Sequence, residues 1–413
     1  MRYFCRKKIE LVVTLICTSY LWLVFYSVIN TKIDGNHEKE LSLLFSTAPH
    51  SKESVEIYEE ISFDHKHVSN NVITFNRQIA KPFRDLPYQV IKAPPVDIPR
   101  SKIHTAKTRK EVARKWAYTP PYSGALQGKQ FNVTTSLLHS MQFPIQDFVT
   151  LNYENVRKFV FVTAASSDFY TPLLALISSI QTNFPDRDIF VFDLGLNKNQ
   201  SEELGMLCNV IIRDFHALFK GFPRHIFELN SYAWKALAIH DILSTSPGVF
   251  WVDTSVRFDR YNLTAVYEHL VMNSQGIGLF SKTGHSIYAA TSNQMYHYLP
   301  TQTSRAESVE QLEANSMLLF KTRPVSSQVL QWLVLCSLDK NCIQPENVRR
   351  FCDFKNSDRF HTFANCHRFD QSALNILLAN MFQFQSSEYF LNDDILHIER
   401  GNTPDEITLT SCS

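Results

Sequence analysis

Residues 158–168 read KFVFVTAASSD, an apolar run that ends in small and polar residues. The run Phe159–Thr163 predicts a buried strand because it is short, continuous and rich in valine and phenylalanine. Similar short apolar runs predict strands at 188–193, 209–213 and 248–253. Helices are predicted at 170–183, 199–207 and 232–243. Strands that alternate with helices favour parallel pairing, so the chain from residue 156 to 413 is predicted to form one α/β domain with a mostly parallel sheet flanked by helices.

Polar residues follow three of these predicted strands. Ala164–Asp168, Asp193 and Asp253–Arg257 each stand directly after an apolar run. Because ligands of open α/β sheets bind beyond the carboxyl ends of the strands, the sequence predicts a ligand site built from these residues.

Among these strand ends, the stretch 251–258, WVDTSVRF, has both an acidic and a basic side chain that could bind a ligand. The carboxylate of Asp253 can hold a divalent cation, and such a cation can neutralise a diphosphate. Arg257 can pair with phosphate through its forked donors, and Lys235 offers an ammonium group. Trp234 offers a ring to a base or a sugar. The plainer alternatives are a turn-forming role for Asp253 and core packing for Trp234.

Composition and missing motifs exclude several classes of protein. Lysine and arginine total 41 against 40 acids in 413 residues, a charge of +1 that argues against a nucleic-acid binder. The hydrophobic content of 44% excludes a disordered chain. The sequence contains no G-x-x-x-x-G-K-[ST], G-x-S-x-G or H-E-x-x-H motif, and Gly276-Ile-Gly278 lacks the third glycine of a dinucleotide-binding loop. P-loop, serine-hydrolase, zinc-protease and dinucleotide-binding functions are therefore disfavoured.

Leu11–Ile29 is a run of 19 residues without a charge, preceded by a basic segment. Its length matches a bilayer, and the basic flank predicts that the N-terminus stays cytoplasmic. We expect a cytoplasmic tail (1–10), a transmembrane signal anchor (11–29) and a luminal remainder, in a single-pass type II protein of the Golgi or another secretory-pathway membrane. A cleaved signal peptide is the alternative, although the exit of the run lacks an Ala-x-Ala pattern.

Residues 30–155 are interrupted by prolines and predict a luminal stem. Within it, residues 100–115 hold seven basic side chains, which form either a solvated face or a contact for anionic lipid or acidic glycan. Six cysteines lie beyond the anchor, an even number that suits an oxidising compartment, and Cys336/Cys342 and Cys352/Cys366 are close enough to suggest local bridges. Glycosylation sequons begin at Asn132, Asn199 and Asn262.

Four segments together carry a family resemblance: Thr163–Ser167, Asp193–Leu196, Tyr232–Lys235 and Trp251–Phe258. In this order the chain resembles the DUF1647 family, a domain of unknown function that is similar to the GT-A nucleotide-sugar glycosyltransferases. The resemblance covers about residues 155–400 and implies a GT-A-like fold of the Rossmann type. It further implies that the nucleotide sugar is bound by Thr163, Ala164, Ser166, Ser167, Asp193, Trp234, Lys235 and Arg257.

In GT-A enzymes the place of Asp253-Thr-Ser255 is held by a D-x-D motif whose acids bind a metal and the sugar diphosphate. Here the second acid is replaced by Ser255, which holds a divalent ion less strongly. The resemblance implies Mn²⁺ as a candidate cofactor, with Asp253, Ser255 and His397 as its ligands. His397 stands where some family 8 enzymes supply a late metal-binding histidine, and a merely buried or solvated histidine is the alternative.

Arg368–Asn375 is similar to the D-Q-D-x-L-N stretch of retaining family 8 glycosyltransferases. This implies that Asp370 and Gln371 face the reacting sugar or the acceptor, with Glu313 as a further candidate acid. The alternatives are that Asp370 caps a helix over 371–380 and that Glu313 lies on a surface helix.

The resemblance as a whole implies a type II membrane glycosyltransferase of the hexosyltransferase kind. It would move a sugar from a nucleotide-sugar donor to a glycan or glycoconjugate acceptor. The alternatives are a catalytically inactive GT-A-shaped luminal lectin or scaffold and, from the stem alone, an adhesion module. Fold resemblance does not choose the donor or the acceptor.

Overall fold

The computed structural model describes residues 116–412 except 125, 355–357, 393 and 402–406. The predicted anchor at 11–29, the basic segment at 100–115 and most of the predicted stem lie outside the described residues. Among the residues that are described, no helix has both the length and the apolar character needed to cross a bilayer.

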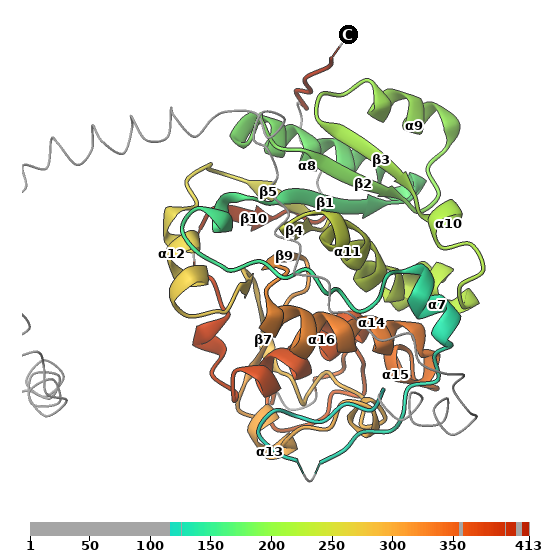
Figure 1. The fold of residues 1–413 in the computed structure, drawn as a ribbon, viewed down its shortest axis with the longest axis vertical. Coiled ribbons are helices and arrows are strands. Elements are labelled where there is room, and N and C mark those ends of the chain that lie inside the picture. Colours follow the sequence, from blue (N-terminus) through green and yellow to red (C-terminus); the bar gives the residue numbers. More distant parts are fainter. Residues whose placement is uncertain (1–115, 125, 355–357, 393, 402–406, 413) are drawn as a thin grey trace, which may run out of the picture. The chain divides into compact units, whose positions relative to one another are not determined.

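A six-stranded sheet forms the centre of the described part, in the order β3-β2-β1-β4-β9-β6 (Figure 1). Four of its strands, β1 to β4, are mutually parallel, and β9 runs antiparallel to both of its neighbours. The strands are β1 (Val160–Ala165), β2 (Ile189–Asp193), β3 (Val210–Asp214), β4 (Gly248–Val252), β6 (Ile277–Leu279) and β9 (Ser316–Phe320). The predicted mostly parallel α/β sheet is therefore confirmed.

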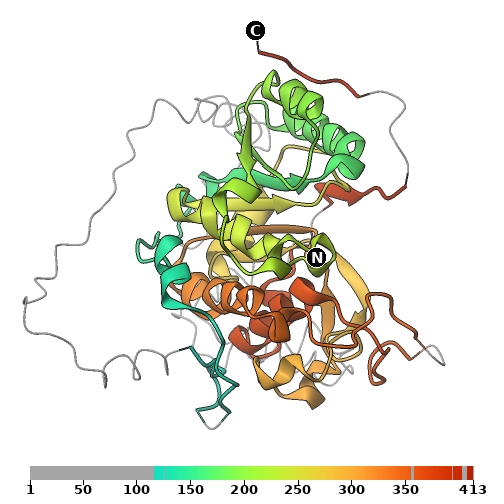
Figure 2. The ribbon, with the colours of Figure 1, turned by 90° about the vertical axis from the view of Figure 1, so that its right-hand side faces the viewer.

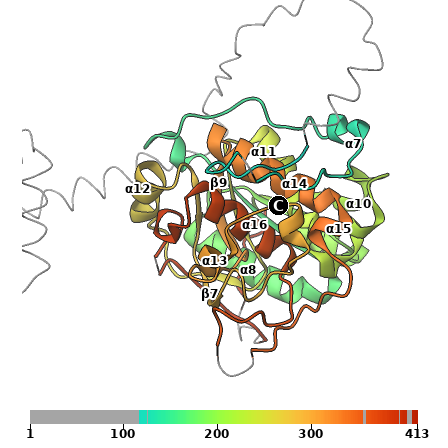
Figure 3. The same ribbon diagram turned by 90° about the horizontal axis from the view of Figure 1, so that it is seen from below.

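Helices cover both faces of this sheet (Figures 1 and 2). On one face α8 (Tyr170–Asn183) packs on the side chains of Phe161 and Phe250, and on the other α11 (Ala233–Thr245) packs on those of Val162 and Trp251. Because successive strand side chains point to opposite faces, both sets are buried, which explains the uninterrupted apolar runs in the sequence. Figure 3 shows α14 (Gln331–Leu338) and α16 (Phe369–Met381) beside α11, with which they share one core.

The remaining elements are short. Two pairs of antiparallel strands lie outside the central sheet: β5 (Val256–Phe258) with β10 (Leu396–Ile398), and β7 (Lys282–Ser286) with β8 (Glu310–Leu312). The other α-helices are α7 (Thr135–Ser140), α9 (Lys198–Gly205), α10 (Phe215–Leu218), α12 (Thr264–Met272), α13 (Thr303–Ala306) and α15 (Lys340–Ile343).

Part of the predicted stem belongs to the core. Tyr118, Phe131, Leu138 and Ile145 are buried in the same apolar cluster as α11 and α16. The packed unit thus begins before residue 156. Its early segments are short and separated by prolines, so they carry too little periodicity to be recognised as structure in the sequence.

Three disulfides connect the described residues. Cys336–Cys342 and Cys352–Cys366 confirm the two predicted local bridges. Cys208–Cys412 joins residues 204 positions apart and holds the C-terminal segment beside β3, where Cys208 N–H also donates to the carbonyl of Thr410 at 2.9 Å.

Candidate functional site

The strand order reverses between β1 and β4. From β1 the chain continues to β2 and β3 on one side, whereas β4 pairs with β1 on the other, with Val162 opposite Trp251. In doubly wound sheets the crevice at such a reversal, beyond the carboxyl ends of the strands, is where ligands bind. Asp253 follows β4 at this edge, as predicted.

Lys235 connects Asp253 to a second acid at this edge. Its Nζ donates hydrogen bonds to Asp253 Oδ1 at 3.0 Å and to the carbonyl of Ala314 at 2.9 Å. It also forms an ion pair with Asp370 Oδ2 at 3.3 Å. The Lys235 side chain is 5% exposed, Asp370 is 9% exposed and Asp253 is 33% exposed, so only Asp253 offers the cluster a substantial open face.

Two helix starts place these charges. Lys235 lies in the first turn of α11 and Asp370 in the first turn of α16. Asp370 does not cap a helix over 371–380, because the helix already begins at Phe369 and its N-cap makes no side-chain hydrogen bond. The carboxylate points to Lys235 instead, where the positive end of the helix dipole also favours it.

Burial and charge shift the pKa values of this cluster in a consistent way. Burial acts to lower the pKa of Lys235, but the neighbouring Asp253 and Asp370 overcome it and hold that pKa above its ordinary value. Burial raises the pKa of Asp370, against the opposing effect of the Lys235 ammonium. Lys235 is therefore firmly charged, and Asp370 takes up a proton more readily than an exposed carboxyl group.

Aromatic rings surround the Lys235 ammonium. The ring centroids of Trp251 and Tyr232 lie 5.3 and 5.7 Å from Nζ, and Trp251 Nε1 donates to Asp253 Oδ1 at 2.8 Å. Trp234 is buried, donates to the carbonyl of Leu229 at 3.1 Å and packs on Trp251. Its position agrees with the core-packing alternative more than with ligand stacking.

The segment Glu313–Asn315, between β8 and β9, contacts the cluster through its backbone carbonyl groups. The carbonyl of Asn315 accepts the Asp253 N–H at 2.7 Å, while Ala314 supplies the carbonyl that binds Lys235. Glu313 accepts from Asn315 and forms an ion pair with Arg400. Glu313 is thus located beside the predicted acids, and it does not lie on a surface helix.

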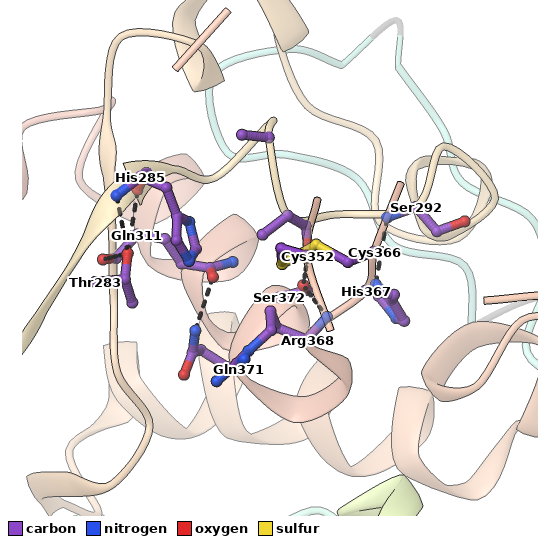
Figure 4. Close-up of a disulfide and its surroundings, with 12 residues drawn as sticks. Thr283, His285, Ser292, Gln311, Cys352, Cys366, His367, Arg368, Gln371 and Ser372 are labelled. Carbon is purple, nitrogen blue, oxygen red and sulfur yellow. Dashed lines mark hydrogen bonds between the residues drawn. A yellow bond between two sulfur atoms is a disulfide. The ribbon is translucent and has the colours of Figure 1, made fainter. Parts of the chain in front are cut away.

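Gln371 connects this segment to a buried polar chain (Figure 4). Its Oε1 accepts from Ala314 N–H at 3.4 Å, and its Nε2 donates to Gln311 Oε1 at 2.7 Å. One turn later Asn375 exchanges two 2.8 Å hydrogen bonds with the backbone of Leu312. The stretch 368–375 therefore fixes β8 and the Glu313–Asn315 segment, in addition to presenting Asp370.

At the end of β1 the predicted nucleotide-binding residues occupy different environments. Ala164, Ser166 and Ser167 are half-buried, whereas Thr163 is fully buried and its Oγ1 has no hydrogen-bond partner among the described residues. Asp193 accepts from the N–H groups of Gly195 and Leu196 at 2.8 and 2.7 Å, which makes it a turn-forming residue at the end of β2.

Arg257 and His397 are engaged with other partners. Arg257 is buried, donates through Nε to Glu399 at 2.9 Å and binds the carbonyl of Thr254 at 2.7 Å. His397 Nδ1 lies 2.9 Å from both carboxylate oxygens of Asp259. Neither side chain is joined to Asp253 by a hydrogen bond or an ion pair in the described part of the chain.

The residues present do not fit a metal site of the D-x-D kind. Both lone pairs of Asp253 Oδ1 already face donors, from Lys235 and Trp251, and Ser255 is neutral. Within residues 116–412, as far as they are described, no three His, Cys, Asp or Glu side chains are grouped to hold an ion. The site therefore lacks the set of carboxylates that Mg²⁺ or Mn²⁺ would use.

Sequence reasoning missed Ala314, Gln311, Glu399 and Arg400. Ala314 takes part through its backbone carbonyl, which any residue could supply. Glu399 and Arg400 are brought to the site by the pairing of β10 with β5, a long-range contact without a local pattern.

A separate cavity of ≈ 620 Å³ lies elsewhere on the described surface. It is lined by Lys129, Gln294, His297, Tyr298, Asn341 and Glu346. None of these residues was predicted to take part in the site, and none of them belongs to the Lys235 cluster.

The family described as "Protein of unknown function (DUF1647)" has a model that matches residues 104–240. The DUF1647 resemblance is thereby confirmed over residues 104–240, which include three of its four segments but not Trp251–Phe258. The match ends within α11 and includes β1, β2, β3 and Lys235. No curated protein matches the chain.

Three solved structures of glycosyltransferases are similar to this chain. The galactosyltransferase LgtC with donor and acceptor sugar analogues is 14% identical, with 58% of this chain and 87% of that chain covered and a TM-score of 0.34. Mouse xyloside xylosyltransferase 1 is 12% identical, with 60% of this chain and 99% of that chain covered and a TM-score of 0.36. The mannosyltransferase Ktr4p from S. cerevisiae is 11% identical, with 71% of this chain and 86% of that chain covered and a TM-score of 0.35.

Proposed function

We propose that this protein binds a nucleotide sugar at the edge between β1 and β4 and transfers the sugar to a glycan or glycoconjugate acceptor. One observation carries the proposal. Lys235 forms ion pairs with both Asp253 and Asp370, and so joins the two segments that resemble the D-x-D and D-Q-D-x-L-N motifs. These segments are far apart in the sequence, and their contact through Lys235 is what a shared active site would require.

Charge at this edge also suits a diphosphate leaving group. The N-termini of α8, α11 and α16 lie at the carboxyl edge or carry its charged residues. The N-cap residues of α8 and α16 make no side-chain hydrogen bond, whereas Ser231 Oγ accepts the first N–H of α11 at 3.2 Å. Each helix start carries a partial positive charge, which stabilises an anion. Stabilisation of the departing diphosphate would be the main contribution of the site to catalysis.

A thermal-shift experiment on the full chain tests donor binding. UDP-, GDP- and CMP-sugars are each added with Mn²⁺ and with EDTA, and one of them should raise the Tm. Asp253→Asn should weaken this shift. Asp241→Asn is the matched control, because Asp241 is also a half-buried acid in an ion pair, with Arg213 at 2.8 Å, but lies away from the cluster. The proposal fails if no nucleotide sugar shifts the Tm.

A luminal lectin is the second candidate, and a specific observation favours it. The cations nearest Asp253 are already engaged, since three protein oxygens surround Lys235 Nζ and Arg257 is paired with Glu399. A site with few open cations can bind neutral sugar hydroxyls through Asp253 and nearby carbonyls. Glycan binding without a shift by any nucleotide sugar would favour this function.

The membrane topology remains part of the proposal. We infer from the sequence that residues 11–29 anchor the protein with its C-terminal part in the lumen of the Golgi or a related compartment. The three disulfides among the described residues suit such an oxidising environment. Protection of the C-terminal part from protease in intact microsomes tests this orientation.

A further inference from the structure

The first carboxylate of the D-x-D place is already bound to a cation. Asp253 Oδ1 accepts hydrogen bonds from Lys235 Nζ at 3.0 Å and from Trp251 Nε1 at 2.8 Å. A carboxylate oxygen has two lone pairs in its plane, so Oδ1 has no position left for a metal ion. Only Oδ2 of this carboxylate can reach a ligand.

The other expected ligands do not complete a metal site. Ser255 contributes a neutral hydroxyl where a second carboxylate would stand. His397 is held by Asp259, and Glu313 is held by Arg400 and Asn315. A divalent ion at Asp253 Oδ2 would have one protein carboxylate oxygen as its anionic ligand, and it would lie close to the ammonium of Lys235, which repels it.

The Lys235 ammonium is built firmly into the fold. It is buried among Asp253, Asp370 and the Ala314 carbonyl, and the rings of Trp251 and Tyr232 enclose it. A cation that is part of a side chain does not have to bind from solution, so it is present in every molecule. It can balance the charge of Asp253 and Asp370 in the way that a bound cation does in other carboxylate sites.

We propose that the buried ammonium of Lys235 takes the place of the divalent cation, so that a nucleoside diphosphate binds at this edge without metal. This inference rests on the proposed function. Lys235 acts through Asp253 and Asp370 and through its fixed charge, and it is therefore a positioning residue. The diphosphate itself would meet the helix N-termini, and the exposed Oδ2 of Asp253 would accept hydrogen bonds from sugar hydroxyl groups of the same ligand.

Calorimetric titrations of the full chain with UDP, GDP and CMP, in EDTA and in Mn²⁺, test this directly. For the nucleotide that binds, we expect the two Kd values to agree within about twofold, because a metal that bridges protein and phosphate would change affinity by tenfold or more. A nucleotide that binds only in Mn²⁺ would overturn the inference and would leave the proposed function intact.

Restoring the second acid supplies a gain-of-function test. Ser255→Asp should create Mn²⁺ binding that the natural protein lacks, seen by electron paramagnetic resonance as loss of the free Mn²⁺ signal. Ser255→Asn is the matched control, since it adds similar volume without charge. If the natural protein removes as much free Mn²⁺ as the Ser255→Asp variant, the inference is wrong, whether or not any nucleotide binds.

Lys235→Met separates charge from packing. This variant should lose nucleotide affinity, and Mn²⁺ should restore it in the Lys235→Met/Ser255→Asp double variant, because an external cation then replaces the internal one. Restoration by Mn²⁺ is not expected from a residue that only supports the fold. Failure of every nucleotide to bind the natural protein would contradict the proposed function, while the Mn²⁺ titrations above would still decide the metal question.

Discussion

The rings of Tyr232 and Phe369 pack with their centroids 6.2 Å apart, and both residues have left-handed backbones, with φ of 54° and 47°. Tyr232 precedes α11 and Phe369 begins α16, so the two strained positions stand next to the turns that carry Lys235 and Asp370. Each such residue costs about 1–3 kcal/mol and persists only where its surroundings impose it. The ring contact thus fixes the two helix starts whose charges meet at the site.

Replacing Tyr232 separates strain from packing. Tyr232→Ala removes the ring and keeps the unfavourable φ, so we expect a loss of about 2 kcal/mol in the free energy of unfolding. Tyr232→Gly should be more stable than Tyr232→Ala by about 1 kcal/mol, because only glycine adopts positive φ without a Cβ clash. Urea denaturation measures both values.

Phe227 provides the control for the expected order of stability of the alanine and glycine variants. It is a half-buried aromatic residue in a short 3₁₀ helix and is not among the residues with positive φ. There Phe227→Gly should be less stable than Phe227→Ala by about 0.5–1 kcal/mol, since glycine loses more backbone entropy on folding. The same order of alanine and glycine at both positions would show that φ of Tyr232 stores no strain.

Removal of the Lys235 charge should be strongly destabilising. Lys235→Met leaves Asp370 buried without its cation, and we expect a loss of about 3–5 kcal/mol. Adding Asp370→Asn should recover about 1–3 kcal/mol of this, because the uncompensated acid is then gone. Denaturant unfolding of the two single variants and the double variant gives the coupling energy.

The Lys321–Asp147 pair is a useful comparison, with a distance of 2.6 Å and Lys321 only 1% exposed. Asp147 is 53% exposed, so water can solvate it once the lysine is lost. Lys321→Met and Asp147→Asn should therefore show weaker coupling than the Lys235–Asp370 pair. Equal coupling energies in the two pairs would mean that the burial of Asp370 does not determine the strength of its coupling to Lys235.

Much of the sheet could be predicted because its signals are local. The helix predicted over 170–183 coincides with α8, and the predicted strands agree with β1 to β4 within about a residue or two at their ends. Continuous apolar runs indicate strands buried on both faces, and such strands define the edge where Asp253 lies.

The rest of the site depends on contacts that local spacing does not encode. Asp370 fits a capping position in sequence, but the chain begins α16 earlier, through the positive φ of Phe369, and turns the carboxylate toward Lys235. Glu399 reaches Arg257 only because β10 pairs with β5. Sequence patterns therefore pointed to two acids that lie at one edge of the sheet, and could not supply their partners.

Glycosylation tests the proposed luminal topology. Asn132, Asn199 and Asn262 are all exposed, and Asn262 already accepts from the N–H and hydroxyl groups of Thr264 at 3.0 and 2.7 Å. If residues 30–413 are luminal, removal of N-glycans should increase the mobility of the protein on a gel, and each Asn→Gln variant of an occupied site should reduce this shift. No shift in the natural protein would argue against the proposed orientation.

Buried histidines should make the fold sensitive to acid, and burial lowers the pKa of His225 as well as of three others. Burial lowers the pKa of His240, His285 and His367 to about 4, and His367 is held neutral between Ser292 N–H at 3.3 Å and the carbonyl of Ile343 at 3.2 Å. In the unfolded chain a histidine has a pKa near 6.5. Between pH 6.5 and 4 the unfolded state therefore binds more protons, and stability falls as the pH is lowered.

Each of these histidines should contribute about 1.4 kcal/mol per pH unit in that window, or about 4 kcal/mol per unit for the three together. The raised pKa of Asp370 acts in the opposite sense, because the native state then binds a proton more readily than the unfolded state does. Urea denaturation at a series of pH values gives the slope. His240→Phe should reduce it by about 1.4 kcal/mol per pH unit, since His240 Nε2 has no hydrogen-bond partner among the described residues and the ring packs on Phe143. Phe143→Leu alters the same contact and should change stability while leaving the slope as it is. An unchanged slope in His240→Phe would show that this histidine is not what couples folding to protons.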